Sequence, residues 1–221
     1  MNLFSTFEPS TMFFSFNWTS SLIMFLILPQ MYWLIPSRIT IMWMMINSIL
    51  HKEFSLLNKM NMFKSSTIFF CSIFNFIVLN NFLGLFPYIF TSSSHISFSL
   101  TLSLPLWVSF MMFGWYKNTT RMFAHLTPQN APNSLLPFLV IIETISSIIR
   151  PGTLAIRLMA NMIAGHLLVT LMSNASSLIS PMFLIGLVFF QILLLTLESA
   201  VSIIQAYVFS ILLALYSSEV N

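Results

Sequence analysis

The chain contains two unusually long apolar stretches, LLPFLVIIETISSIIRPGTLAIRLMANMIAGHLLVTLMS at 135–173 and PMFLIGLVFFQILLLTLESAVSIIQAYVFSILLALY at 181–216. A helix of about 35 residues is roughly 50 Å long, whereas the hydrocarbon core of a bilayer is about 30 Å thick. Such helices have to tilt steeply, bend, or lie partly in the membrane plane. The short link at 174–180 predicts an antiparallel hairpin, and Pro151-Gly152 predicts a bend in its first helix.

The composition indicates a membrane protein along the whole chain of 221 residues. It is 57% hydrophobic and only 6% charged, whereas about a quarter of the residues of a soluble domain are charged. The net charge of +3 is too sparse for the basic face that nucleic-acid binding requires. Cys71 is the single cysteine, so no internal disulfide is expected. No cleavable targeting segment is expected at the N-terminus.

Three further spans and one surface segment are expected before the hairpin. Spans of about 20 apolar residues fit 12–35, 66–90 and 98–116. The segment 38–64 mixes apolar with basic residues and is typical of an amphipathic surface helix. The predicted fold is therefore all-α, with about three transmembrane helices, the surface helix and the tilted hairpin. We treat residues 1–221 as one polytopic membrane domain.

The positions of the basic residues predict the orientation of the chain in the membrane. Outside the spans they gather in two loops, 38–64 and 117–134. An even number of crossings separates these loops, so both lie on one side. The positive-inside rule makes this the cytoplasmic side or its organelle equivalent. The N-terminus, which has Glu8 and no basic residue, is then on the other side.

Arg157 is the residue of the hairpin that is most expensive, in free energy, to place inside a membrane. It lies within TLAIRLMANMIAGHLL at 153–168. A charge near the bilayer centre is expensive, and arginine cannot release its proton to escape that cost. Glu143 lies fourteen residues earlier, which is about 20 Å along a straight helix. An ion pair between the two is therefore not expected unless the bend shortens the distance, and Arg157 needs an anionic partner in this chain or another.

Other polar side chains accompany Arg157. Asn161 shares its helix face. One interpretation is that it orients the guanidinium or a water molecule, and the other is that it forms a hydrogen bond between helices. His166 titrates near neutral pH, so it either exchanges protons or is simply hydrogen-bonded. Arg150, beside Pro151, is interpreted as a structural residue near an interface. In the second stretch one stripe carries four polar residues: Gln191, Glu198, Ser202 and Gln205.

The stripe indicates either a wetted path or a polar contact with a partner. Glu198 favours the wetted path. A carboxylate can release and accept protons, whereas amide side chains would be sufficient for a polar contact with a partner. In an antiparallel hairpin Glu198 and His166 are expected to approach each other. Metal-ligand spacings, phosphate loops, nucleophile motifs and dinucleotide fingerprints are absent, so no metal, cofactor or catalytic site is expected. This set of residues suits proton translocation.

The same residues carry a family resemblance. The segments IRLMANMIAGHLL at 156–168, ETIS at 143–146 and LESAVSIIQAYVF at 197–209 resemble subunit a of the F-type ATP synthases, closest to the mitochondrially encoded invertebrate form. The similarity extends over essentially the whole chain, including NNFLGLFPYIFTS at 80–92. The resemblance implies a proton-translocating stator subunit of the Fo motor with two offset half-channels. It also implies a multi-pass protein of the mitochondrial inner membrane, with the N-terminus in the intermembrane space and both basic loops in the matrix.

The implied partners are the rotor c-ring, other Fo and peripheral-stalk subunits, and membrane lipid. Arg157 matches the family's essential arginine, which faces a carboxylate of the rotor ring. His166 and Glu198 match positions of the half-channel that faces the intermembrane space. The full set that the resemblance assigns to proton translocation is Arg157, Asn161, His166, Glu198, Gln205 and Glu143, the last with an open role. Met159 departs from the family, where Thr or Gly is common.

Two alternatives remain at this point. One is a structural membrane subunit of another respiratory complex, which has no need of Arg157 beside a His and a Glu. The other is a self-contained channel or transporter, for which the chain shows no internal repeat.

Overall fold

The computed structural model describes residues 6–12, 14–30, 34–57, 66–127, 132, 135–176 and 180–220. Regular structure in this part of the chain is helical, which confirms the all-α prediction. Within these residues lie the short 3-10 helices η2 Phe16–Thr19 and η3 Ser92–Ser94 and seven α-helices: α1 Ser20–Ile27, α2 Arg38–Leu57, α3 Ser66–Gly84, α4 Ile96–Lys117, α5 Thr119–Leu126, α6 Leu136–Ala175 and α7 Pro181–Val220.

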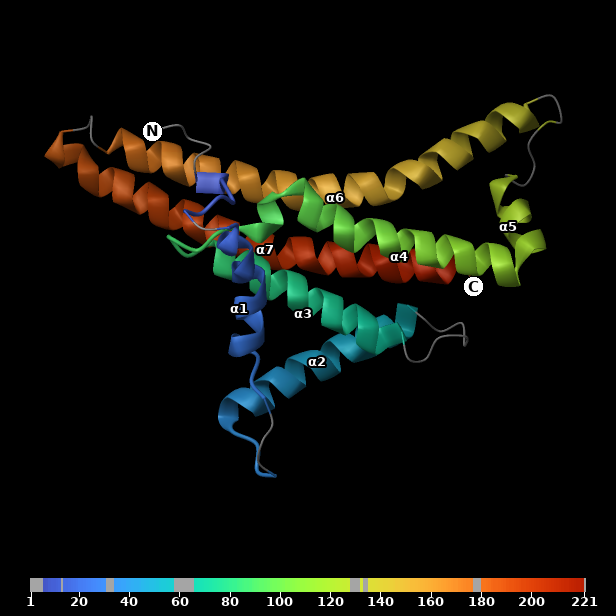
Figure 1. Ribbon diagram of the computed structural model, residues 1–221, viewed down its shortest axis with the longest axis horizontal. Coiled ribbons are helices and arrows are strands. Elements are labelled where there is room, and N and C mark those ends of the chain that lie inside the picture. Colours follow the sequence, from blue (N-terminus) through green and yellow to red (C-terminus); the bar gives the residue numbers. More distant parts are fainter. Residues whose placement is uncertain are drawn as a thin grey trace.

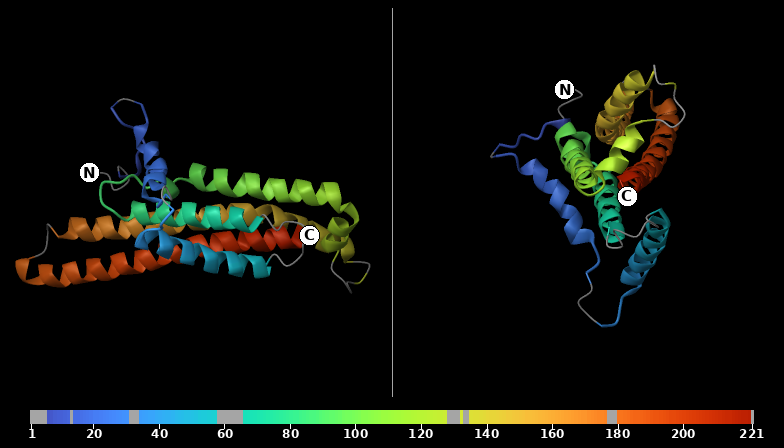
Figure 2. Two further views of the ribbon diagram at one scale, coloured as in Figure 1. Left: turned by 90° about the horizontal axis from the view of Figure 1, so that it is seen from below. Right: turned by 90° about the vertical axis from the view of Figure 1, so that its right-hand side faces the viewer.

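The C-terminal hairpin of α6 and α7 dominates the molecule. Each helix has 40 residues and is therefore about 60 Å long. They run antiparallel, side by side, along most of the longest axis (Figures 1 and 2). α6 bends near its middle (Figure 1), and Pro151 lies inside the helix. The hairpin is thus confirmed, with both helices slightly longer than predicted.

Two further long helices cover the hairpin. α3 packs mainly on α7, and α4 packs mainly on α6. Among the described residues, four helices are long and apolar enough to cross a membrane: α3, α4, α6 and α7. α3 ends at Gly84, before Pro87 and earlier than the predicted boundary at residue 90.

α1 covers less than the predicted span 12–35. Helical structure runs from Phe16 to Ile27, and the backbone of Leu28 is extended with ψ 122°. Pro29 explains this end, because the residue before a proline avoids the helical region. Residues 13 and 31–33 of the predicted span lie outside the described residues. α1 runs across the direction of the long helices (Figure 1).

α2 occupies the first part of the predicted surface segment 38–64, and residues 58–64 lie outside the described part. Polar contacts hold α2 against its neighbours. The Nδ2 group of Asn75 on α3 donates to Asn47 at 2.7 Å, and the hydroxyl of Tyr207 on α7 donates to Glu53 at 3.0 Å. α2 is therefore anchored to both α3 and α7.

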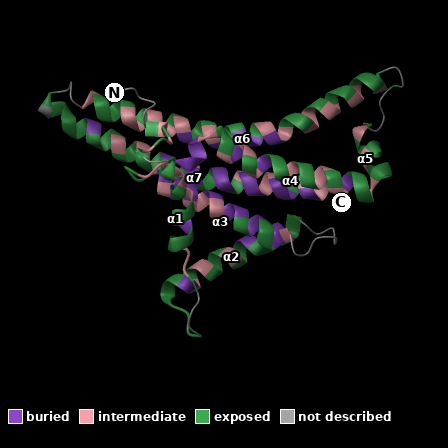
Figure 3. Cartoon of the chain, in the orientation of Figure 1, coloured by how far each residue is buried: buried purple, intermediate pink, exposed green. Residues whose placement is uncertain are grey.

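The core lies where α3, α6 and α7 meet, near the middle of the hairpin (Figure 3). Its buried side chains include Phe70, Phe74, Ile77, Leu154, Leu158, Phe209 and Leu213. Away from the core the hairpin is mostly exposed and apolar. Phe189 and Phe190 of α7, for example, are 64% and 60% exposed. Such a surface requires lipid or a partner protein.

Candidate functional site

Arg157 lies on the exposed face of α6. Its neighbours Leu154 and Leu158 are buried within the core, on an adjacent side of the helix. The packing of these leucines turns the guanidinium outward. Among the described residues, Arg157 makes no hydrogen bond or ion pair, although the helix around it is apolar. The guanidinium is therefore accessible to lipid or to a partner protein beside this face of α6.

Glu143 is paired with a different arginine. The Nη2 atom of Arg150 lies 3.4 Å from Oε1 of Glu143, seven residues earlier on α6. The guanidinium of Arg150 also lies over the ring of Tyr216, 5.6 Å from its centroid. The structural interpretation of Arg150 agrees with these contacts. Among the described residues, Glu143 therefore pairs with Arg150 and not with Arg157.

Asn161 and Gln205 link α6 to α7, one helical turn beyond Arg157. The Nδ2 group of Asn161 donates a hydrogen bond to Oε1 of Gln205 at 2.9 Å. Gln205 is buried, whereas Asn161 is exposed on the same side of α6 as Arg157. The bond therefore joins the arginine face to the polar stripe of α7.

The polar stripe of α7 points into the protein. Glu198, Ser202 and Gln205 are all buried, and Gln191 is half-buried. The predicted common face is thus confirmed, and it faces α6 and the helices behind it.

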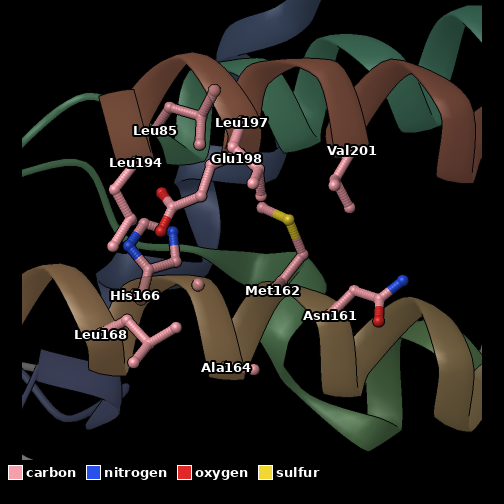
Figure 4. A pocket seen from close by; sticks show the side chains of 11 residues that line it. Leu85, Asn161, Met162, Ala164, His166, Leu168, Leu194, Leu197, Glu198 and Val201 are labelled. Atoms are coloured by element: carbon pink, nitrogen blue, oxygen red, sulfur yellow. The ribbon is translucent and has the colours of Figure 1, made fainter. Parts of the chain in front are cut away.

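His166 and Glu198 meet in a cavity of about 200 Å³ between α6 and α7. In Figure 4 the carboxylate of Glu198 and the imidazole of His166 point toward one another. Oε1 of Glu198 and Nε2 of His166 are buried, and neither has a hydrogen-bond partner among the described residues. The predicted approach across the hairpin is confirmed. Two titratable side chains thus share a space large enough for a water molecule, and their unpartnered polar atoms could bind it.

Gly165 makes the position of Glu198 possible. A Cβ atom at residue 165 would lie 2.9 Å from Oε1 of Glu198 and 3.0 Å from its Cδ. Any other residue would push the carboxylate away from the backbone of α6. The ring of Phe7 packs edge-on against His166, with centroids 6.4 Å apart, and shields the imidazole on another side.

Three further buried polar side chains, on α3, η3 and α4, do not follow from sequence reasoning. The side chain of Asn81 on α3 is fully buried, and within the described structure neither its oxygen nor its nitrogen has a partner. The hydroxyls of Ser93 and Ser103 are in the same situation. The asparagine pair at 80–81 and the serines at 92–94, inside an apolar context, are the signals in the sequence that point to buried polar residues here.

The turn that leads into η3 lies close to Met162, a residue that lines the Glu198 cavity. η3, Ser92–Ser94, packs against α3, α4 and α6. A Cβ atom at Gly84 would lie 3.0 Å from Thr91 and 3.6 Å from Met162, which also lines the cavity. Buried polar groups are normally satisfied by water when protein partners are missing. The described residues bring no three His, Cys, Asp or Glu side chains together as a metal site would need.

The chain is similar to known proteins along its whole length. A family model described as "ATP synthase A chain" matches residues 4–218. The ATP synthase subunit a of Locusta migratoria is 57% identical over 221 residues, covering 99% of this chain and 98% of the relative. Those of Drosophila melanogaster and Aedes aegypti are 57% and 56% identical, each covering 100% of this chain and 99% of the relative.

Proposed function

The chain belongs to the ATP synthase A chain family, and from this premise we propose that it is the proton-translocating stator subunit of the Fo motor. It is a multi-pass membrane subunit of ATP synthase and not a catalytic subunit of that complex. The proposal concerns how its residues couple proton movement to rotation.

Arg157 is the observation that carries this proposal. It is a permanent cation in an apolar span, on an exposed face, without a partner among the described residues. A membrane protein retains such a charge only where an anion or water compensates it. A carboxylate on each subunit of a rotor c-ring would supply that anion as it passes. The arginine then holds the ionised carboxylate and stops protons from crossing directly between the two half-channels.

The titratable groups of α6 lie on both sides of Arg157. His166, with Glu198 beside it, is nine residues later, about 13 Å along the helix axis. Glu143 is fourteen residues earlier, about 20 Å in the other direction. This separation suits two half-channels that are offset along the helix, with the arginine between them. In this scheme His166 and Glu198 serve the half-channel facing the intermembrane space, and Glu143 lies toward the other.

Asn161 and Gln205 have a positioning role in the scheme. Their hydrogen bond fixes α6 against α7 one turn from Arg157. The distance between the arginine and the Glu198 cavity therefore stays constant while the rotor moves. Gln205 also continues the polar stripe that begins at Glu198.

The proposed location is the mitochondrial inner membrane, with lipid, the rotor ring, and other Fo and peripheral-stalk subunits as neighbours. Placing the basic segments 38–64 and 117–134 in the matrix satisfies the positive-inside rule. The N-terminus is then in the intermembrane space.

Replacement of Arg157 in the assembled complex tests the proposal. The Arg157→Ala complex is expected to assemble and to lose ATP synthesis driven by a proton gradient, measured in reconstituted vesicles per assembled complex. Arg157→Lys should restore little, because an ammonium lacks the planar fork that binds a carboxylate through two hydrogen bonds. Arg38→Ala, which removes an exposed arginine from the start of α2, is the matched control. ATP synthesis at the unaltered rate in Arg157→Ala would refute the role of the arginine and support the structural-subunit alternative.

A self-contained channel is the other alternative, and it requires a different measurement. The purified chain alone is expected to conduct protons far more slowly than the assembled complex, because its arginine lacks the moving carboxylate. Conduction by the chain alone at the rate of the complex would favour the channel.

A further inference from the structure

A second cavity, of about 460 Å³, lies at the end of the molecule where α5 stands between the end of α4 and the start of α6 (Figure 1). Its walls come from α4, α5, α6 and the end of α7. Glu143 lines it, so this space lies on the other side of Arg157 from the Glu198 cavity. It is far larger than the volume of about 30 Å³ that one water molecule occupies in the liquid.

The polar side of this cavity is suited to water. Its polar lining residues come from α5, α6 and α7: His125, Glu143, Thr144, Ser147, Arg150 and Tyr216. The hydroxyls of Thr144 and Ser147 each donate to a backbone carbonyl of α6 at 2.8 Å, which leaves their oxygens able to accept from water. Arg150 and Glu143 are an ion pair, so together they add no net charge. Water needs two to four polar partners per molecule, and this wall offers them.

His125 connects this cavity with the surface. Met122, His125 and Leu126 line the cavity from α5, and their spacing of three and four residues places them on one face of that helix. Met122 and Leu126 are half-buried, whereas His125 is exposed. Among the described residues, the imidazole makes no hydrogen bond or ion pair, so both ring nitrogens are available to water. An imidazole exchanges protons near neutral pH and can accept on one nitrogen while it donates from the other.

Few other groups around His125 can take part in proton exchange. The charged or titratable residues on the surrounding elements are Glu143 and Arg150 on α6, Tyr216 on α7, Arg121 on α5 and Lys117 at the end of α4. Arg121 and Lys117 do not line the cavity. Arginine keeps its proton, and a phenol releases its proton only in alkaline solution. Glu143 and His125 are therefore the lining groups whose protons exchange readily.

We propose that His125 passes protons between the external water and Glu143, through water in this cavity. The proposal rests on the function proposed above, because it adds a residue to the half-channel of Glu143. In the inward direction one ring nitrogen takes a proton from outside, and the other gives its proton to water in the cavity. That water passes a proton to the Glu143 carboxylate, so the imidazole ends neutral and the carboxyl group holds the proton. The reverse sequence releases a proton.

Such a residue matters because free protons are scarce. At neutral pH, with about 10⁻⁷ M hydronium, a site meets one at most about 100–1,000 times per second at the diffusion limit. An exposed imidazole also receives protons from buffer molecules, which are far more abundant. His125 thus would supply Glu143 faster than hydronium alone could.

Proton pumping at low buffer concentration tests this role. The assembled complex is placed in vesicles with segment 117–134 facing outward, ATP is added outside, and a dye inside reports the pH. In weakly buffered external solution near neutral pH, His125→Ala should pump at least about fivefold more slowly than the unaltered complex. This loss is smaller than the roughly 10²–10⁴-fold effect of a positioned acid or base on a reacting group, because water remains a slower route.

Rescue by external buffer distinguishes proton exchange from a structural role. Raising the external concentration of MOPS, a sulfonate buffer that does not cross the membrane, should restore pumping by His125→Ala. His51→Ala, which removes an exposed imidazole from α2, is the matched control and should show no loss that depends on MOPS. A loss in His125→Ala that no concentration of MOPS restores would overturn the proposal.

His125→Gln keeps a polar side chain of similar size that cannot exchange protons. It should be as slow as His125→Ala at low buffer, and it decides the question if the alanine variant fails to assemble. Pumping at the unaltered rate by His125→Gln would overturn the proposal, while inactive Arg157→Ala in the same vesicles would leave the proposed function intact. Pumping by Arg157→Ala would instead refute the proposed function, whatever the result at position 125.

Discussion

Replacing Gly165 by alanine perturbs the Glu198 cavity by a single methyl group. The added Cβ would lie 2.9 Å from Oε1, 3.0 Å from Cδ and 3.1 Å from Cγ of Glu198, whereas ordinary contact begins at 3.4 Å. The carboxylate therefore has to move by about 0.5 Å, and it is the flexible end of its side chain. We expect the carboxylate to shift rather than the helices to separate.

The cost to stability should be small. Overpacking costs about 1–3 kcal/mol, and alanine stabilises a helix interior by about 1 kcal/mol relative to glycine. The net destabilisation is then about 0–2 kcal/mol, so the complex should still assemble.

The cost to proton transfer should be larger. A misplacement of about 1 Å near reacting groups lowers a rate by about a hundredfold, so half of that shift corresponds to about tenfold. The assay is proton pumping into vesicles by the assembled complex, normalised to its content of this subunit.

Gly186→Ala is the matched control, because nothing lies within 4 Å of a Cβ atom there. It makes the same change in helix α7 away from the cavity, and proton pumping should be unaltered. Unaltered pumping in Gly165→Ala, or an equal loss in both variants, would refute the claim that the carboxylate position matters.

Three further predictions concern the same helices. Glu198→Gln should abolish most proton flux, and adding His166→Glu should restore part of it by returning a carboxylate to the cavity; flux equal to that of the unaltered complex in Glu198→Gln would contradict the proposed path. Gln205→Leu and Asn161→Ala should each lower proton flux, and the double variant should lose no more than the worse single one, since both remove one hydrogen bond; additive losses would indicate separate roles. Tyr207→Phe removes the hydrogen bond to Glu53 of α2. It should lower the thermal stability of the complex slightly and leave the proton flux per assembled complex unaltered. A loss of flux without a loss of stability would show that this hydroxyl belongs to the proton path.

The hairpin and the polar stripe of α7 were predictable because both follow from local properties of the chain. The lengths of 135–173 and 181–216 exceed a perpendicular span, and the 40-residue helices agree with this. The spacing of Glu198, Ser202 and Gln205 determines a common face whatever surrounds α7, and the structure buries all three. Helical periodicity is sufficient for such predictions.

Features that depend on contacts between distant segments were not predictable. The sequence does not reveal that Gly165 makes room for Glu198, because the two meet only when α6 and α7 pack. The buried Asn81 is similar, since in sequence it is simply a polar residue near the end of an apolar span. The short first helix had a local signal in Pro29, but the apolar run 12–35 outweighed it in the prediction.

The outward position of Arg157 also bears on how the subunit survives before assembly. A newly inserted copy carries this charge into lipid with no counter-ion from its own described residues. The bilayer has to thin or admit water around it, at a cost of at least about 2.5–3.5 kcal/mol. On the function proposed above, a rotor carboxylate would remove that penalty on assembly, so the unassembled chain would be the less stable species. The charge that the proposed motor uses in every turn would then also favour assembly of the complex.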